Sequence, residues 1–278
     1  MSSPSTLPPA RTQEQLRNHF EVEKELAGRL RQSTREERSQ LYGTLYEELF
    51  SRVPDHPRWT RLDSEEIRSR NVAAQMKLVR EYLGQDSTLI EFAPGNGWLG
   101  FEAAKTARKV IGVDISNQLD PKTPVPVNYQ HVVYDGYHLD LPDSIAEIAF
   151  SFQFLEHLHP DDVGPHFELV HRLLKPGGVY VFDTPHRYSG PHDISRCFTN
   201  ELLCFHFQEW THRQMRALLA RHGFKTSYVF RMGRTQRGSL FNIVVDALEL
   251  LLAPLPHGFR RTLCQRLFPA VTMVAVKG

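Results

Sequence analysis

The spacing of apolar residues changes near residue 69 and divides the chain into two predicted parts. Between residues 12 and 53, leucines and aromatic residues recur every three or four positions among Glu, Arg and Gln, which is typical of amphipathic helices. Thr34 and Glu37 form a capping-box pattern that starts a second helix, and the prolines of RVPDHPRW end it. We therefore predict a helical N-terminal cap over residues 12–68, preceded by a disordered, proline-rich tail over residues 1–11.

After one more helical stretch, short apolar runs alternate with helical patterns. Alternation of this kind predicts βαβ units, and hence an α/β fold with a mostly parallel sheet and helices on both faces. The later run FNIVVDALELLLAPL is shorter than the roughly 20 residues that a membrane span needs, so we predict a buried or half-buried helix. Because GFRRTLCQR just after it is basic, a peripheral contact with lipid stays open. The predicted strands are TLIEFA, KVIGVDI, VNYQHVV, IAEIAFSFQ, GGVYVFDTP, KTSYVFRMG and AVTMVAV.

Composition narrows the class of partner. The chain has 278 residues, of which 41% are hydrophobic and 23% charged, and its formal net charge is +1. Nucleic-acid binding usually requires a basic face and a high pI, so we expect no nucleic-acid partner. The three cysteines have no metal-type spacing and are predicted to be free thiols in a reducing compartment. Since no apolar secretory segment opens the chain, we expect a cytoplasmic protein.

The segment LIEFAPGNGWLG joins a predicted strand to a predicted helix through a glycine-rich turn. Its last six residues match G-x-G-x-x-G, a dinucleotide-binding fingerprint, so an NAD(P)-dependent oxidoreductase is one hypothesis. Glu91 argues against it, because a carboxylate at the end of the strand repels a pyrophosphate and suits an ammonium-bearing ligand. Asp114, at the end of the next strand, can accept hydrogen bonds from both ribose hydroxyls of any adenosine. Asp135, before Gly136, can accept a hydrogen bond from the amino group of adenine.

Residues Glu91 to Gly97 resemble the first motif, E-x-G-x-G-x-G, of class I S-adenosylmethionine-dependent methyltransferases, with Ala93 in place of the first glycine. Asp114, Asp135-Gly136, FSFQFLEHL and LLKPGGVYVFDTP fall in the order and spacing of that family's later motifs. The resemblance implies S-adenosylmethionine as the cofactor and methyl transfer as the activity. It also implies a seven-stranded, Rossmann-like sheet whose last two strands form an antiparallel hairpin.

The same resemblance assigns the domain and the cofactor site. It places the methyltransferase domain at residues 69–278, with a helical insertion at about residues 235–268. The cofactor-binding residues that it implies are Glu91, Phe92, Ala93, Gly95, Gly97, Asp114, Ile115, Asp135, Gly136, Phe152 and Gln153.

The loop after the fifth predicted strand, TPHRYSGPHDISRCFTNELLCFHFQEWT, holds our candidates for catalysis. Loops at the carboxyl ends of parallel strands face the ligand, so this one should overhang the methyl acceptor. If the acceptor is a hydroxyl, a general base helps, and histidine is the usual choice. We name His192 first, with Asp193 or His206 as helpers and His186 as a further candidate. We expect a small-molecule acceptor that is methylated at oxygen by in-line displacement and is hydrophobic or glycan-like.

Other hypotheses stay open. Methylation of a protein or lipid acceptor is one, and a partner protein that keeps the fold without catalysis is another. The latter would be marked by loss of the cofactor carboxylates, but Glu91, Asp114 and Asp135 are all present. The chain lacks an S-x-x-x-Y-x-x-x-K array, which would favour an oxidoreductase, and an Asn-Pro-Pro-Tyr motif, which would favour amine methylation.

The segment LEHLHPDD could supply histidine and carboxylate ligands to a divalent ion. However, Pro160-Asp161-Asp162 is a typical helix start, with acids at the positive end of the helix. We therefore predict no metal site, and we expect Glu156 and His157 to line the wall near the cofactor. The cap residues that could line the acceptor pocket are Tyr42, Tyr46 and Trp59.

Overall fold

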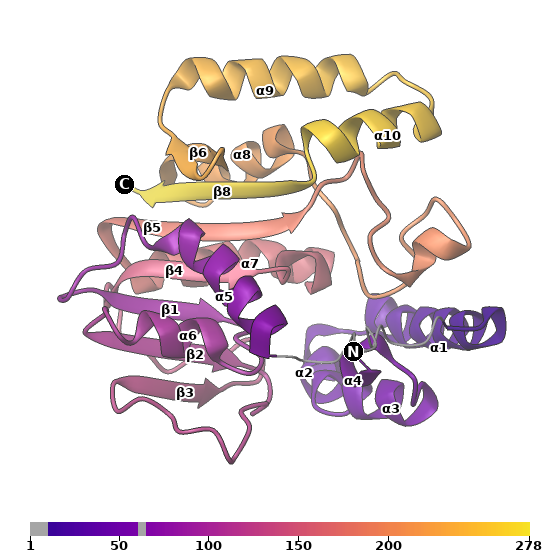
Figure 1. The fold of residues 1–278 in the computed structure, drawn as a ribbon, viewed down its shortest axis with the longest axis horizontal. Helices are drawn as coiled ribbons and strands as arrows, with labels where there is room; N and C mark the ends of the chain where they lie inside the picture. Colours follow the sequence, from indigo (N-terminus) through magenta and orange to yellow (C-terminus); the bar gives the residue numbers. More distant parts are fainter. Residues whose placement is uncertain (1–10, 61–64) are drawn as a thin grey trace, which may run out of the picture.

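The computed structural model describes residues 11–60 and 65–278. The predicted tail, residues 1–11, lies outside the described residues except for Arg11, whose guanidinium pairs with Asp55 at 2.7 Å. The side chain of Trp59 also lies outside them. Figure 1 shows a helical cap beside an α/β domain in which one sheet carries helices on both faces.

Four helices make up the described part of the cap: α1 (Gln13–Gln32), α2 (Arg35–Tyr42), α3 (Leu45–Arg52) and α4 (Pro57–Thr60). Capping boxes start the first two, because the side chains of Thr12 and Thr34 accept a hydrogen bond from the backbone N–H three residues later. Apolar side chains of α1 and α3 pack on one another and on Phe205 of the α/β domain. The cap and the domain therefore share a small core.

The strands of the sheet are β1 (Thr88–Phe92), β2 (Lys109–Asp114), β3 (Tyr129–Val133), β4 (Ala146–Phe152), β5 (Leu174–Pro185), β6 (Phe224–Arg231), β7 (Arg234–Gln236) and β8 (Ala270–Lys277). Their order in the sheet is β3-β2-β1-β4-β5-β8-β6-β7. The first five in that order pair in parallel, and β8 pairs antiparallel with both β5 and β6. The carboxyl ends of the parallel strands therefore meet at one edge, where the cap lies (Figure 1).

The sheet has one strand more than the predicted seven. Strand β7 continues the sheet as an antiparallel partner of β6. The two strands are joined by Met232 and Gly233, whose φ angles are +54° and +75°. Positive φ at both positions is what a two-residue type I′ turn requires. The sequence signal was weak, because RTQ is short and polar and Met is an unusual residue at the first of these positions.

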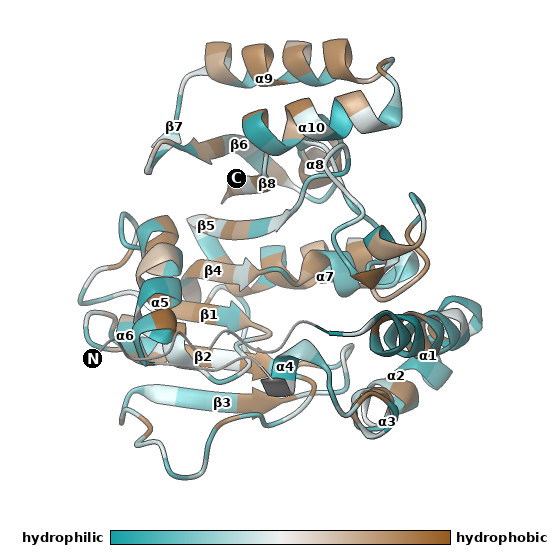
Figure 2. Cartoon of the chain, turned by 45° about the vertical axis from the view of Figure 1, so that its right-hand side comes forward, coloured by the Kyte–Doolittle hydropathy of each residue, from teal (hydrophilic) through white to brown (hydrophobic). Residues whose placement is uncertain are grey.

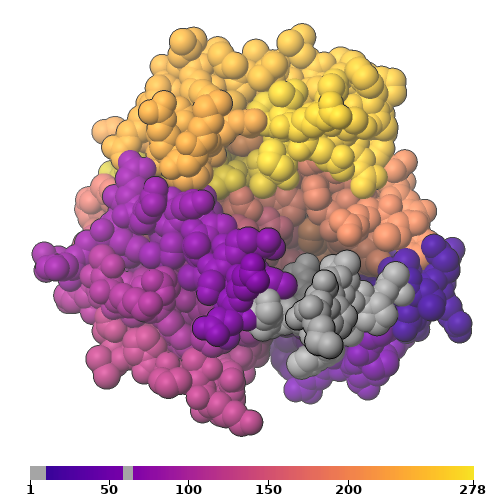
Figure 3. Space-filling model, in the orientation of Figure 1, coloured from indigo at the N-terminus to yellow at the C-terminus, as the bar shows by residue number. Residues whose placement is uncertain are grey.

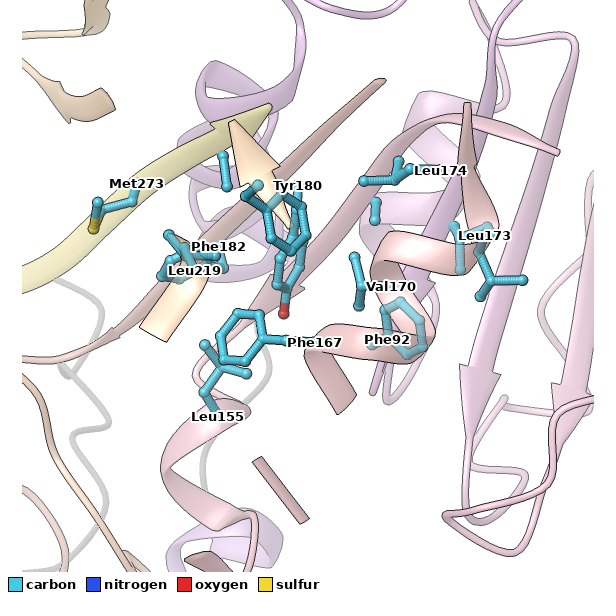
Figure 4. Close-up of a cluster of buried hydrophobic side chains, with 14 of the residues drawn as sticks. Phe92, Leu155, Phe167, Val170, Leu173, Leu174, Tyr180, Phe182, Leu219 and Met273 are labelled. Atoms are coloured by element: carbon cyan, nitrogen blue, oxygen red, sulfur yellow. The ribbon is translucent and has the colours of Figure 1, made fainter. Parts of the chain in front are cut away.

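Two hydrophobic layers sandwich the sheet. Helices α7 (Pro160–Leu173) and α8 (His212–Arg221) cover one face, and α5 (Glu65–Val79) and α6 (Trp98–Ala103) cover the other. Figure 4 shows the first layer, in which Phe167 and Val170 of α7 lie near Tyr180 and Phe182 of β5. Strand β5 is buried over most of its length, which fits a central strand.

An insertion of two helices, α9 (Ser239–Leu252) and α10 (His257–Leu267), precedes β8. Its inner side packs Val245, Leu252 and Cys264 near Val229 of β6. The outer face of α9 is apolar and forms a brown band at the edge of the molecule (Figure 2). The exposed residues between Leu240 and Leu251 are all apolar: Leu240, Ile243, Val244, Ala247, Leu250 and Leu251. Within the described ranges, we find no helix with the length and apolar character needed to cross a bilayer.

Candidate active site

The turn after β1 has the backbone of a ligand-binding loop. Ala93, Gly95 and Gly97 adopt positive φ angles of +52°, +54° and +74°. A Cβ on Gly97 would lie 2.8 Å from Leu119, so this position requires glycine. Ala93, which replaces the family's first glycine, holds the left-handed conformation at a cost of roughly 1–2 kcal/mol. The departure from the motif therefore leaves the course of the loop intact.

A cavity of about 940 Å³ lies between this edge of the sheet and the cap. Six predicted cofactor residues line it: Ala93, Gly95, Asp114, Ile115, Gly136 and Gln153. From the opposite side the cap contributes Glu23, Tyr42, Tyr46, His56 and Arg58. Tyr42 and Tyr46 thus line the cavity, while their contact with an acceptor stays a prediction, and the cavity joins the cofactor loops to the cap.

Asp114 is placed to receive hydroxyl groups. It is 5% exposed, and burial raises the pKa of its carboxyl group. The backbone N–H groups of Gly95 and Ser116 donate to it over long distances of 3.4 and 3.3 Å. Such long bonds leave acceptor capacity for a ligand. The carboxylate can therefore bind a diol at the cavity edge, as predicted for a ribose.

Glu91 lies beneath the loop and, as far as the described residues define the cavity, does not line it. Its side chain is 4% exposed and accepts a hydrogen bond from the backbone N–H of Gly100. Burial, more than the nearby Asp114, raises the pKa of Glu91 to about 8. The aromatic ring of Tyr129 lies close by, because Gly100 and Gly112 have no Cβ to exclude it. Glu91 therefore contacts the first turn of α6, outside the described cavity lining.

The other predicted cofactor residues outside the described cavity lining are Phe92, Gly97, Asp135 and Phe152. Strand alternation turns Phe92 into the core, where its ring lies 4.9 Å from that of His166. Asp135 accepts hydrogen bonds from the backbone N–H groups of Tyr137 and His138 at 2.8 and 2.6 Å. Its carboxylate therefore shapes the turn whose residues Gly136 and Tyr137 border the cavity.

The loop after β5 uses its predicted catalytic residues for its own structure. Nδ1 of His192 contacts Glu209 at 3.2 Å, and Nε2 contacts Ser189 at 3.2 Å. Asp193 accepts hydrogen bonds from the backbone N–H groups of Ser195 at 2.9 Å and His206 at 3.2 Å. The described lining of the cavity contains neither His192 nor Asp193.

His186 is fully buried on the side of the insertion, away from the cap. Its Nε2 donates to Glu249 of α9 at 2.9 Å, and its ring stacks on Phe268 at 5.4 Å between centroids. Glu249 also accepts hydrogen bonds from His212 and Arg213 at the start of α8. His186 thus fastens the insertion to the domain, and it does not belong to the described cavity wall.

Glu156, His157 and His206 form a cluster where the turn after β4 meets the loop after β5, and of the three only His157 belongs to the described cavity lining; this cluster is called the His157 wall below. His157 borders the cavity, and burial lowers the pKa of its imidazole to about 3. The ring of His206 lies edge-on to it, with 5.0 Å between centroids. Glu156 is fully buried behind them, and burial raises the pKa of its carboxyl group to about 7. Of the four residues predicted for catalysis, only His206 belongs to this cluster, and the described cavity lining contains none of the four.

Buried polar contacts tie the cap over the cavity. The guanidinium of Arg38 in α2 donates to Asp162 of α7 at 2.9 and 3.0 Å and to the hydroxyl of Tyr137 at 3.1 Å. Arg31 of α1 donates to backbone carbonyls of the loop after β5, including that of Leu203 at 2.8 Å. Figure 3 shows the cap, in indigo, against that loop, in salmon. Sequence reasoning missed Glu23, which lines the cavity; its signal was a single acid within the apolar stripe of α1.

A family model described as a methyltransferase domain matches residues 64–229, more than half of the chain. A protein of Mycolicibacterium smegmatis, named a probable S-adenosylmethionine-dependent methyltransferase, is 29% identical over 161 residues. The match covers 56% of this chain and 58% of that relative, so the chain spans little more than half of the relative's length.

Solved structures share the fold at low identity. An S-adenosylmethionine-dependent methyltransferase from Thermotoga maritima aligns with a TM-score of 0.51 and 15% identity, over 82% of this chain and 98% of that one. Phosphoethanolamine N-methyltransferase 2 from Haemonchus contortus aligns with a TM-score of 0.50 and 16% identity, over 75% and 53%. The matched domain carries the glycine turn and Asp114 at the cavity edge. This chain therefore belongs to the class I S-adenosylmethionine-dependent methyltransferases.

Proposed function

We propose that this chain transfers a methyl group from S-adenosylmethionine to a hydroxyl oxygen of a small molecule bound beneath the cap. One observation carries the proposal: a single cavity is bordered by the cofactor loops on one side and by aromatic and polar cap residues on the other. Its volume of about 940 Å³ is near the upper end of ligand pockets, so it can hold a cofactor and an acceptor together.

The residues present fit the cofactor. Asp114 has acceptor capacity for the ribose, Ile115 offers an apolar surface to adenine, and Gly95 leaves open space next to its backbone. When bound, S-adenosylmethionine supplies a sulfonium methyl group, whose C–S bond breaks with its electron pair left on sulfur as the acceptor oxygen forms the C–O bond. The protein's part is to align the hydroxyl, which can contribute on the order of 7–11 kcal/mol. The hydroxyl proton is released at the His157 wall and passes to water in the cavity.

The acceptor end of the cavity supports a ligand with apolar faces and several hydroxyl groups. Tyr46, Phe50 and Phe205 offer aromatic surface there, whereas Glu23 and Arg58 offer an acceptor and donors. Glu23 is 6% exposed, and hydrogen bonds from His19 and Phe205 outweigh burial to lower the pKa of its carboxyl group. A glycan or a lipid-linked polyol fits this mixture better than a peptide amine would.

Calorimetric titration with S-adenosylhomocysteine and, in parallel, with NAD tests the proposed function. We expect binding of the former alone, and we expect Asp114→Asn to weaken it at least tenfold because the ribose loses its charged acceptor. Arg29→Met, on the far surface of the cap, is the control. Binding of NAD without S-adenosylhomocysteine would overturn the proposal.

We also propose that the outer face of α9 contacts an anionic lipid surface. The segment from residue 231 to 278 has seven Lys and Arg residues and only two acids. Both acids are engaged internally: Asp246 pairs with Arg216, and Glu249 is 2% exposed. An exposed apolar helix face in a segment of net positive charge is suited to the headgroup region of an anionic bilayer.

A further inference from the structure

Four groups of His, Cys, Asp and Glu side chains in the described parts of the chain bring one donor atom each within 4.8 Å of the others. Clusters of this kind often satisfy themselves by internal hydrogen bonds, so proximity alone does not indicate a metal site. A metal site is distinguished by a buried oxygen or nitrogen whose lone pair receives no hydrogen bond from the protein.

Three of the four clusters are internally satisfied. In the cluster of His186, His212 and Glu249, Oε1 of Glu249 accepts from both imidazoles and Oε2 accepts from the backbone of Arg213. In the two clusters that contain Glu23, its Oε2 contacts His19 at 2.6 Å and its Oε1 accepts from the backbone N–H of Phe205 at 3.1 Å. The oxygens of Glu249 and Glu23 therefore already have partners within the protein.

The fourth cluster is the His157 wall, and it differs at the carboxylate. Oε2 of Glu156 accepts from the hydroxyl of Thr184 at 2.9 Å. Its Oε1 is buried without a hydrogen-bond partner among the described residues. An unpaired buried oxygen is unfavourable by roughly 1–3 kcal/mol, and more when it is charged.

The imidazoles of this cluster are held as metal ligands usually are. Nδ1 of His157 donates to the backbone carbonyl of Phe205 at 3.1 Å, and Nδ1 of His206 donates to Oε1 of Glu209 at 2.9 Å. Each hydrogen bond places a proton on Nδ1, so Nε2 is the nitrogen of each ring that is not used by these contacts. Outer contacts from a carbonyl and a carboxylate are the common second layer around histidine ligands.

We propose that Glu156, His157 and His206 bind one divalent transition-metal ion, through Oε1 of the carboxylate and Nε2 of each imidazole. Two imidazoles and one carboxylate favour ions such as Mn²⁺ or Zn²⁺ over Mg²⁺ or Ca²⁺. This differs from the absence of a metal site predicted from the sequence, where the local pattern indicated a helix start. His206 lies 49 positions beyond His157, so their proximity was not visible there.

The location gives the ion a role in the proposed function, on which this step of the inference rests. His157 borders the cavity, so an ion held by this cluster would lie next to it. Such an ion would lower the pKa of an acceptor hydroxyl bound to it, so that the hydroxyl would lose its proton to water more readily and keep an oxygen lone pair for the methyl group. His157 then serves as a ligand, and no protein base is required.

Metal binding can be tested without any acceptor. The full chain is stripped with EDTA, dialysed, and titrated with Mn²⁺ and Zn²⁺ by calorimetry, with elemental analysis of the loaded protein. We expect one ion per chain in the wild type and at least a tenfold loss of affinity in Glu156→Gln and in His206→Asn. Glu209→Gln, which removes the charged partner of the His206 ring and also of His192, should lower the affinity about 10–100-fold.

His212→Asn in a satisfied cluster is the matched control and should keep one ion per chain. Circular dichroism checks that each variant folds, and Co²⁺ absorption spectra of the wild type report imidazole ligation even if a variant does not fold. The proposal fails if the folded wild type binds no ion, or if the control alters binding as much as the ligand variants do. Because S-adenosylhomocysteine binding is measured separately, failure of the metal site is distinguishable from failure of the proposed function.

Discussion

A carboxyl group buried beneath a cofactor loop, as Glu91 is, makes stability depend on pH. Its pKa is raised by burial to about 8, whereas the unfolded chain has the ordinary value of 4.5. Between these values the folded chain keeps the proton and the unfolded chain loses it, so the folded state loses stability as pH rises. This loss of stability is absent below pH 4.5 and complete above about pH 8.

Glu91→Gln should remove this dependence, since an amide does not titrate. The free energy of unfolding of the wild type relative to this variant should fall by up to about 1.4 kcal/mol per pH unit between pH 5 and 8. Urea denaturation of both proteins at several pH values measures it. A difference that stays constant across that interval would contradict the assigned pKa.

At the scale of elements, the contact between α2 and α7 decides whether the cap stays closed. Arg38 is 2% exposed and Asp162 is 7% exposed, so the ion pair between them is buried. Removing one partner of a buried pair typically destabilises by about 3–5 kcal/mol, because the other charge stays unpaired. Arg38→Met should therefore open the cap.

Hydrogen exchange measures this opening element by element. We expect Arg38→Met to speed amide exchange in α2 and the rest of the cap, while β1, β4 and β5 keep their protection. Arg29→Met removes a cap arginine that pairs with Glu48 on the surface, where a pair is worth about 0–1 kcal/mol, and should leave exchange nearly unchanged. Equal effects of the two substitutions would show that the buried pair does not fasten the cap.

The elements also show what a sequence can and cannot predict here. The capping box at Thr34, the apolar strands and the glycine turn are local patterns, and the structure has them where they were predicted. The surroundings of the catalytic candidates depend on contacts between residues far apart in the chain: His192 is held by Glu209, 17 residues away, and Glu23 of the cap contacts Phe205, 182 residues away. Strand alternation alone could have excluded Phe92 from the cavity.

For the whole molecule, the outer face of α9 predicts binding to anionic vesicles. Leu251 and Ile243 are 70% and 62% exposed, and burying such a side chain contributes about 1.5–3 kcal/mol. Leu251→Asp or Ile243→Asp should weaken sedimentation with phosphatidylglycerol-containing vesicles roughly tenfold or more. Val127→Asp, at a still more exposed apolar site in the loop before β3, is the control. Equal vesicle binding by the wild type and the α9 variants would exclude the outer face of α9 as the lipid-binding surface.

The position of Tyr42 has a consequence for the order of events in turnover. Tyr42 of the cap lies over the loop of Gly136, since a Cβ on that glycine would be 3.6 Å from its ring. The same cap carries the residues that we propose to contact the acceptor. A cofactor that enters first is thus covered by the acceptor and the cap together. We therefore expect compulsory-order kinetics, in which the demethylated cofactor is the last product to leave.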